Sequence, residues 1–315
     1  MKHQKTPRAG YLYIIIAATL WAVSGTSSKF LFNRGVTPQD LVQLRLVIST
    51  VLLFGFLLIY KPSLIRISAK DIWRFILLGT VGMAAIQYTY FFAISRINVG
   101  IAILLEYLSS IFIVLYTLFF TREKLSLVVI MALAGTISGC YLVVGAYNTD
   151  ILTMNSAGII AGVCCALAFA YYTIQGEVVM RKYEPVTVLF YALIGAVFVW
   201  NLVLPPFKSF ASGYSYSEWG VILYIGVLGT AIPFSLYFKG VKMIRSARAN
   251  ITSTLEPIIA GLISFVFLGE TMEALQLAGA LLVISSIILL QLNHELDDKT
   301  PDIARRKPTG HSPEP

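Results

Sequence analysis

Two glutamates are the residues of this sequence best placed to do chemistry in an apolar environment. Glu106 and Glu256 each lie deep inside a long apolar run, whereas every aspartate lies at the end of such a run or in a loop. The three histidines, His3, His294 and His311, all lie near the ends of the chain. A carboxyl group in an apolar setting can bind and release a proton close to neutral pH. Glu106 and Glu256 are therefore the candidate proton-coupling residues.

Each glutamate also has a structural interpretation, in which a hydrogen bond to a neighbouring helix holds it in place. Pro257 follows Glu256 directly. Because proline removes a backbone donor and frees a carbonyl, Glu256 can equally serve a broken helix. Glu106 has no acidic counterpart in the second half of the chain, described below. Both interpretations stay open for both residues.

The composition of the chain predicts that these glutamates lie inside a membrane. Of the 315 residues, 57% are hydrophobic and 13% charged, and the mean hydropathy is +0.78. Soluble domains carry about 25% charged residues, so this chain lacks the polar surface of a soluble or disordered protein and is predicted to be an all-α integral membrane protein. A bilayer needs about 20 apolar residues per helix. Ten transmembrane helices are expected, near 11–31, 40–60, 72–93, 98–120, 125–146, 155–175, 186–204, 218–238, 247–268 and 273–292.

Several other classes of function are disfavoured. The net charge of +8 comes from short clusters between apolar runs, which does not indicate nucleic acid as a partner. The three cysteines, Cys140, Cys164 and Cys165, have no metal-ligand spacing and are interpreted as packing residues. No catalytic or phosphate-binding motif occurs, so we expect neither an enzyme nor a cofactor or metal site. A receptor or scaffold is disfavoured because the longest segment outside the membrane is the tail 293–315, predicted to be disordered and cytoplasmic.

Basic residues predict the orientation. With residues 1–10 placed in the cytoplasm, 19 of the 24 lysines and arginines fall in segments on that side. The positive-inside rule then places both termini in the cytoplasm. We expect the chain to lie among the lipids of the cell (plasma) membrane.

The chain contains an internal repeat at an offset of 147 residues. Pro38 aligns with Pro185, Glu123 with Glu270, and the pair Gly79 and Gly82 with Gly226 and Gly229. The first repeat, 11–146, and the second, 155–292, each contain five predicted helices. Because five is odd, the second repeat must be inverted in the membrane, and the basic loops change sides accordingly. Inverted repeats are typical of secondary transporters, whose substrate site lies near the midplane between the halves.

Four segments resemble the EamA-type transporters of the drug/metabolite transporter superfamily. They are AATLWAVSGTSSKFL, LVQLRLVISTVLLF with Arg45, FFTREKLS, and ANITSTLEPIIAGLISFVFLGETMEALQLAGALLVIS. The resemblance covers about residues 10–292. It implies ten helices around a central cavity and export or import of small metabolites without ATP. The first repeat departs from the second, because Ser109 and Ser110 stand where Glu256 and Pro257 stand in the other half.

The resemblance also implies that the first, third, fourth, sixth, eighth and ninth spans line the cavity. Polar and aromatic residues on these spans suit a small amphipathic metabolite, although polar stripes also occur at tight helix contacts. The predicted substrate-binding residues are Trp21, Ser24, Ser28, Gln87, Tyr88, Glu106, Tyr107, Tyr171, Gln175, Tyr237, Ser253 and Glu256.

Two cations and two glycine pairs have alternative interpretations. Lys29 and Arg45 lie towards the outer ends of the first two spans, where they either snorkel to water or attract anions to a vestibule. The pairs Gly135/Gly139 and Gly158/Gly162 fit close helix packing, either within one chain or between two copies of a homodimer.

These features together predict a secondary transporter, an exporter or permease for small metabolites such as amino acids or drug-like compounds. It would work by alternating access, driven by protons or, alternatively, as an uncoupled facilitator.

Overall fold

The computed structural model describes residues 7–121, 126–148, 155–268 and 273–292, all of them helical or in connecting segments. Glu123, Glu270 and the predicted tail 293–315 lie outside this range. The helices are α1 (Pro7–Asn33), α2 (Pro38–Tyr60), α3 (Ile72–Leu77), α4 (Ala85–Arg96), α5 (Val99–Glu106), α6 (Ser109–Tyr116), α7 (Leu127–Val143), α8 (Ser156–Val179), α9 (Pro185–Val203), α10 (Tyr216–Gly226), α11 (Ile232–Ile244), α12 (Ser246–Ser253), α13 (Glu256–Leu268) and α14 (Ala274–Leu292).

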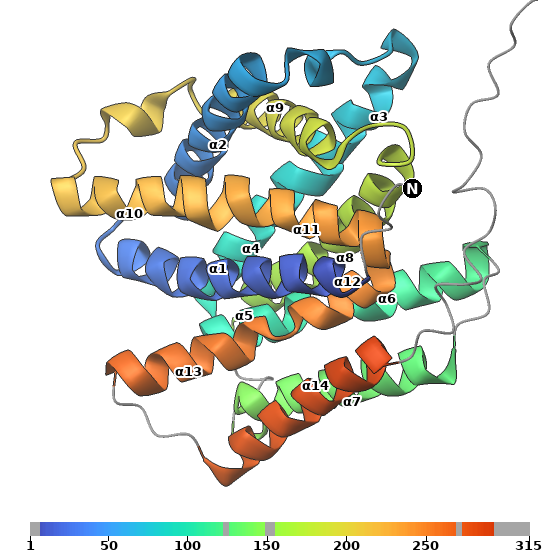
Figure 1. Cartoon of the computed structure of the whole chain (residues 1–315). Helices are drawn as coiled ribbons and strands as arrows, with labels where there is room; N and C mark the ends of the chain where they lie inside the picture. Colours follow the sequence, from blue (N-terminus) through green and yellow to red (C-terminus); the bar gives the residue numbers. More distant parts are fainter. Residues whose placement is uncertain (1–6, 122–125, 149–154, 269–272, 293–315) are drawn as a thin grey trace, which may run out of the picture.

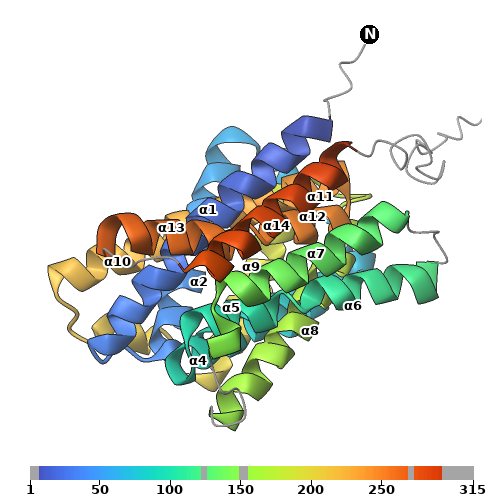
Figure 2. The ribbon, with the colours of Figure 1, turned by 90° about the horizontal axis from the view of Figure 1, so that it is seen from below.

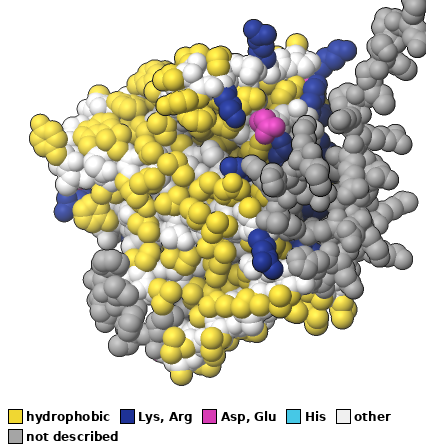
Figure 3. Space-filling view, viewed as in Figure 1, with side chains coloured by type: hydrophobic (Ala, Val, Ile, Leu, Met, Phe, Trp, Pro, Cys, Tyr) yellow, Lys and Arg dark blue, Asp and Glu magenta, His cyan; other side chains and the backbone are white. Residues whose placement is uncertain are grey.

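Within the described residues, eight continuous helical stretches are long and apolar enough to cross a membrane, and α7 is a shorter apolar helix. The remaining predicted span, 247–268, corresponds to α12 and α13. These helices form one bundle, with α1 between α11 and α13 (Figure 1). Figure 3 shows a broad hydrophobic surface along the bundle and most of the visible lysines and arginines towards the end that holds the N-terminus.

Four of the predicted spans are not regular helices. The third and eighth contain π-helical segments, Leu78–Ala84 and Val227–Ala231, and the fourth and ninth are broken between α5 and α6 and between α12 and α13. The proline at 257 predicts the second break, because it cannot continue a hydrogen-bonded helix. The first break, at Tyr107 and Leu108, contains no proline.

The repeat is visible in the positions of the helices. At the interval of 147 residues, α2 and α9 begin at Pro38 and Pro185, α5 and α12 at Val99 and Ser246, and α6 and α13 at Ser109 and Glu256. The two helix breaks are therefore equivalent positions in the two halves.

Equivalent helices run in opposite directions. α7 and α14 begin 147 residues apart and lie side by side (Figures 1 and 2). Val129, near the start of α7, packs in one cluster with Leu290 at the end of α14. At the other end, Gln276 Nε2 donates to the Val143 carbonyl at 3.2 Å. This antiparallel pairing makes the second half an inverted copy of the first.

The two predicted glycine pairs pack inside the chain. A Cβ added to Gly139 would lie 2.8 Å from the Gly279 carbonyl, and one added to Gly158 would lie 2.7 Å from the Ile97 side chain. The partner of Gly162 is Leu105. These contacts use the glycines to bring helices of one chain together, so they provide no support for the predicted homodimer.

Candidate functional site

The two candidate glutamates lie in the same buried pocket. This deep pocket has a volume of about 30 Å³ and is lined by residues of both halves of the chain. Its volume leaves room for little more than ordered water, so it is a narrow pocket around its polar groups. The lining residues are Trp21, Ser24, Gly25, Arg45, Ile86, Gln87, Tyr90, Glu106, Phe169, Phe234 and Glu256.

Arg45 belongs to this pocket and does not snorkel to water. Its side chain is only 3% exposed. Nε donates to Thr230 Oγ1 and one terminal nitrogen donates to the Gly229 carbonyl, both at 2.8 Å, and the guanidinium carbon lies 4.6 Å from the Phe91 ring centroid. The π-helical segment that carries Gly229 supplies this carbonyl, as π-bulges often do at functional sites. A buried guanidinium needs such partners.

The carboxyl group of Glu256 lies where the two helix breaks meet. The Tyr107 hydroxyl, at the break after α5, is 2.8 Å from Glu256 Oε2 and 2.5 Å from the Ser253 carbonyl at the end of α12. Glu256 is 3% exposed. Glu106, the last residue of α5, lines the same pocket as Glu256 and Arg45. The pocket therefore holds two carboxyl groups and one guanidinium.

Two polar atoms of the pocket lack hydrogen-bond partners among the described residues. They are Trp21 Nε1, which can only donate, and Glu256 Oε1. Buried polar atoms are normally paired, so an unpaired donor and an unpaired carboxyl oxygen in one cavity indicate a ligand or water site. Aromatic rings form its wall: the Trp21 ring centroid lies 5.0 Å from that of Phe234 and 6.2 Å from that of Phe169.

Of the twelve predicted substrate-binding residues, five line the deep pocket: Trp21, Ser24, Gln87, Glu106 and Glu256. Tyr107 contacts Glu256, and the Tyr237 ring centroid is 5.3 Å from that of Trp21. The Ser253 carbonyl is in turn bonded to the Tyr107 hydroxyl. Ser28 is buried one turn from Ser24 and donates to its carbonyl at 2.7 Å. The remaining three, Tyr88, Tyr171 and Gln175, line neither of the two cavities described here, and Tyr88 packs against Trp200.

Sequence reasoning missed several residues of the site. Tyr90, Phe169 and Phe234 line the pocket, and Asn250 lies just beyond it. Phe169 and Phe234 carry no signal that separates them from lipid-facing neighbours, whereas Tyr90 carries a hydroxyl on the same predicted span as Gln87 and Tyr88. Asn250 does carry such a signal, because an amide inside a predicted span is costly without partners.

Asn250 belongs to a polar layer on the side of the pocket towards the chain termini. Its side-chain oxygen accepts hydrogen bonds from Ser109 and Ser110, and its nitrogen donates to the Tyr237 hydroxyl at 3.3 Å. Tyr237 is 3.1 Å from Thr173 Oγ1. All five side chains are buried. This layer separates the pocket from the end of the bundle at which α1 begins.

Ion pairs close the same end of the bundle. Glu177 accepts from Arg245 Nε at 3.2 Å and from the Ser246 backbone at 2.9 Å, which ties the end of α8 to the junction of α11 and α12. Lys182 lies 2.5 Å from Asp71. The hydrogen bond with Asp71 raises the pKa of Lys182 above its usual value.

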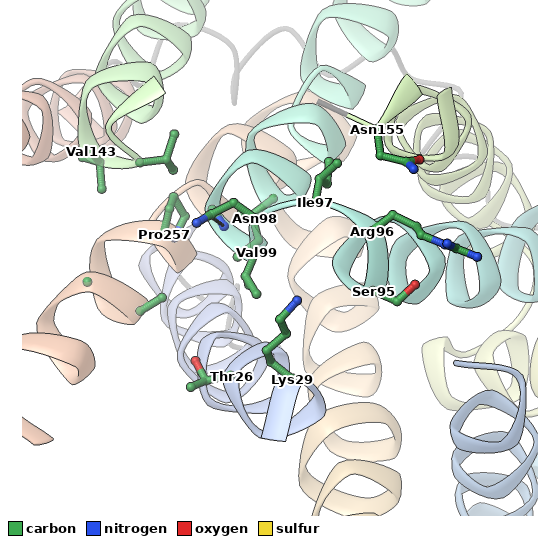
Figure 4. A pocket seen from close by; sticks show the side chains of 15 residues that line it. Thr26, Lys29, Ser95, Arg96, Ile97, Asn98, Val99, Val143, Asn155 and Pro257 are labelled. Carbon is green, nitrogen blue, oxygen red and sulfur yellow. Dashed lines mark hydrogen bonds between the residues drawn. The ribbon is translucent and has the colours of Figure 1, made fainter. Parts of the chain in front are cut away.

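The opposite end of the bundle is open. A vestibule of about 660 Å³ lies between the far ends of α1 and α4, the starts of α5 and α8, the end of α7, and α13 (Figure 4). Lys29, Asn98 and Pro257 are among its lining residues. Thr26 and Pro257 of the vestibule directly follow Gly25 and Glu256 of the deep pocket, and Ile103 lies about one helical turn before Glu106, so the two cavities follow each other across the bundle.

An inverted-repeat helical bundle with a polar pocket between its halves is the architecture of many secondary transporters. The EamA-like transporter family matches residues 8–145 and again 156–292. The chain belongs to this family, which is a family of transporters and not of enzymes.

Relatives match nearly the whole chain. "Uncharacterized inner membrane transporter YicL" of Salmonella typhimurium is 28% identical over 91% of this chain and 96% of its own length. "Threonine/homoserine exporter RhtA" of Escherichia coli K12 is 26% identical over 92% of this chain and 95% of its own. One solved crystal structure has a TM-score of 0.71 over 91% of this chain and 98% of that chain at 19% identity, which shows a common fold.

Proposed function

We propose that this protein exports small metabolites that carry a protonated amine, amino acids above all, by alternating access coupled to protons at Glu106 and Glu256. The observation that carries the proposal is that two carboxyl groups, one of them with an unpaired oxygen, line the same narrow pocket between the two halves. The relative named as a threonine/homoserine exporter supports amino acids as the first substrates to test.

The charges of the pocket favour an ammonium group. Two donors of Arg45 are already engaged by Thr230 and Gly229, so much of its hydrogen-bonding capacity serves the protein. The carboxyl group of Glu106 makes no hydrogen bond to a described residue, and Glu256 has one oxygen unpaired. Acidic oxygens beside the faces and edges of Trp21, Phe169 and Phe234 suit a small organic cation.

Hydrogen-bond counting at Tyr107 supports proton binding. Its hydroxyl lies within hydrogen-bond distance of the Ser253 carbonyl and of Glu256 Oε2, but it carries a single proton. A carbonyl can only accept a hydrogen bond, and an ionised carboxylate can also only accept. A proton on Glu256 lets the carboxyl group donate to Tyr107 while Tyr107 donates to Ser253, which satisfies both contacts. We therefore assign a protonated Glu256 to this arrangement.

Alternating access follows from the arrangement of open and closed ends. The vestibule is wide and open, the deep pocket is narrow, and the polar layer around Asn250 with the Glu177 ion pair seals the opposite end. Rocking of one repeat against the other would exchange these roles. Ionising both carboxyl groups of one narrow, buried pocket is unfavourable, so an ammonium and a proton would compete for them.

We further propose that the sealed end faces the cytoplasm of a cell with this protein in its plasma membrane, and that the repeats extend over 11–146 and 155–292. The two termini lie at the same end, since the Tyr11 hydroxyl near the start of α1 donates to the Leu290 carbonyl at the end of α14. Basic residues at this end, among them Lys182, Lys242 and Arg245, support the cytoplasmic assignment.

Proteoliposomes test the proposal directly. The purified protein is expected to exchange radiolabelled threonine and homoserine and, given a proton gradient, to accumulate them against their own gradient. Glu106→Gln and Glu256→Gln should abolish gradient-driven accumulation, and Glu256→Gln should keep the fold because an amide nitrogen can donate to Tyr107. Glu184→Gln is the matched control, because this exposed glutamate lies outside the pocket and pairs with the partly exposed Lys242 at 3.1 Å.

Three results would count against parts of the proposal. Exchange without response to a proton gradient would indicate an uncoupled facilitator. Wild-type pH dependence in both glutamine variants would exclude these carboxyl groups as proton sites. Equal transport of threonine and of its deaminated analogue 3-hydroxybutyrate would exclude recognition of the amine.

A further inference from the structure

We infer that the vestibule contains a binding site for the carboxylate group of a small organic anion, centred on Lys29 and separate from the deep pocket. The vestibule is more than twenty times larger than the deep pocket, at about 660 Å³ against about 30 Å³, and it is open. Its lining residues include the cations Lys29 and Arg96 and no acidic residue. The acidic side chains Glu106 and Glu256 line the deep pocket instead, together with Arg45.

Lys29 is placed for this role by its surroundings. It is half-buried near the end of α1, and its ammonium donates to the Ile94 carbonyl at 3.0 Å. No described carboxylate forms an ion pair with it, so two of its three donors remain available. Figure 4 shows the ammonium reaching towards the turn at Asn98 and Val99, whereas the Arg96 guanidinium extends away from it. Lys29 is therefore the central charge of the site.

Two amides add donors but no charge. The side-chain oxygen of Asn98 accepts from the Gly100 backbone at 2.8 Å, and that of Asn155 accepts from the Gly158 backbone at 3.0 Å. Both oxygens are thus engaged at the starts of their own helices, which leaves the amide nitrogens as donors in the vestibule wall. Ser95 and Thr26 use their hydroxyl protons on carbonyls of their own helices.

One nearby cation with neutral donors around it matches a singly charged, planar acceptor such as a carboxylate. For the amino acids proposed above, the deep pocket would receive the ammonium end and the vestibule the carboxylate end of a molecule passing towards the open side. Such a site exists whether or not transport is driven by protons, so its test measures binding in the vestibule and requires no transport.

The test uses a cysteine in the vestibule wall. Thr26 is exposed in this cavity, and Thr26→Cys is labelled in the full-length protein with an anionic and a cationic methanethiosulfonate, against the background of native Cys140, Cys164 and Cys165. We expect Lys29→Gln to lower the ratio of anionic to cationic labelling rates by roughly five-fold or more, as loss of a nearby charge requires. Sodium propionate should slow labelling saturably, whereas propionamide should not, at an ionic strength held constant with sodium chloride.

Matched variants make the result specific. Lys208→Gln removes an exposed lysine from the loop after α9, at the same end of the bundle but outside the vestibule, and should leave the ratio unchanged. Lys29→Arg should keep both the ratio and the protection. High salt should lower the ratio in Thr26→Cys itself, because it screens the charge without altering the fold. An unchanged ratio in Lys29→Gln, or equal protection by propionate and propionamide, would overturn the site.

Discussion

The Tyr107 hydroxyl lies 2.8 Å from Glu256 Oε2, which joins the helix break of the first repeat to the helix break of the second. The two residues are 149 positions apart in sequence, close to the repeat interval of 147, so each lies at the equivalent helix break of its own half. Proton binding at Glu256 would therefore change a contact on which both halves meet. That is the coupling an alternating-access transporter requires between a proton and the relative position of its halves.

Tyr107→Phe tests this contact. The variant leaves Glu256 Oε2 and the Ser253 carbonyl without the hydroxyl, at a cost of about 1–3 kcal/mol for buried unsatisfied groups. We expect proton-driven accumulation of threonine to fall roughly ten-fold, the factor for about 1.4 kcal/mol, with a displaced pH profile. Tyr141→Phe, at an exposed tyrosine of α7, is the control. An unaltered pH profile in Tyr107→Phe would separate this hydroxyl from proton binding.

Arg45→Gln tests the buried cation. The variant loses charge-assisted hydrogen bonds to Thr230 and Gly229, each worth about 1.5–3 kcal/mol, and leaves the carboxyl groups of Glu106 and Glu256 without their positive neighbour. We expect a lower melting temperature in detergent and loss of exchange. Arg34→Gln, at an exposed arginine over the Phe30 ring, should change neither. Full stability of Arg45→Gln would contradict a structural role for these bonds.

Glu177→Gln tests the closed end. The amide oxygen can still accept from Ser246, but the charge opposite Arg245 is lost. The conformation in which this end is sealed and the vestibule is open should therefore be less stable. In a Thr173→Cys background we expect thiol labelling at this buried position to accelerate, by roughly three- to ten-fold for about 0.7–1.4 kcal/mol. Glu184→Gln again serves as the control. Equal labelling in the two variants would show that Glu177 does not close this end.

Gly79→Ala tests the close approach of the two repeats. A Cβ at this position would lie 2.7 Å from the Ala192 carbonyl oxygen and from the Gly195 Cα, so backbone would have to move. Overpacking of this kind costs about 1–3 kcal/mol, and we expect a lower melting temperature in detergent. Gly55→Ala, whose Cβ would meet nothing within 4 Å, should melt like the parent. Equal melting of the two variants would refute the assigned packing.

The sequence by itself determined the membrane class, the number of spans and the inverted repeat. The length of an apolar run and the positions of basic residues can be read directly along the sequence. A bilayer requires helices of a given apolar length and favours basic loops on the cytoplasmic side. Glu106 and Glu256 were found for the same reason, since acids are rare inside spans. Pro38 and Pro185, which align in sequence, begin equivalent helices in the structure. The aligned glycine pairs lie at close helix contacts.

Only the tertiary structure decided which residues share the pocket. Arg45 is near the end of its span by counting, but the π-helical segment around Gly229 supplies partners that hold its charge inside. Tyr107 contacts Glu256 because it lies at a helix break, and no proline in the sequence predicts that break. Tyr88, Tyr171 and Gln175 lie outside the two cavities although their spans contribute to the site. The direction in which a helical side chain points depends on helix rotation and local breaks, which packing between distant segments sets and the order of residues does not.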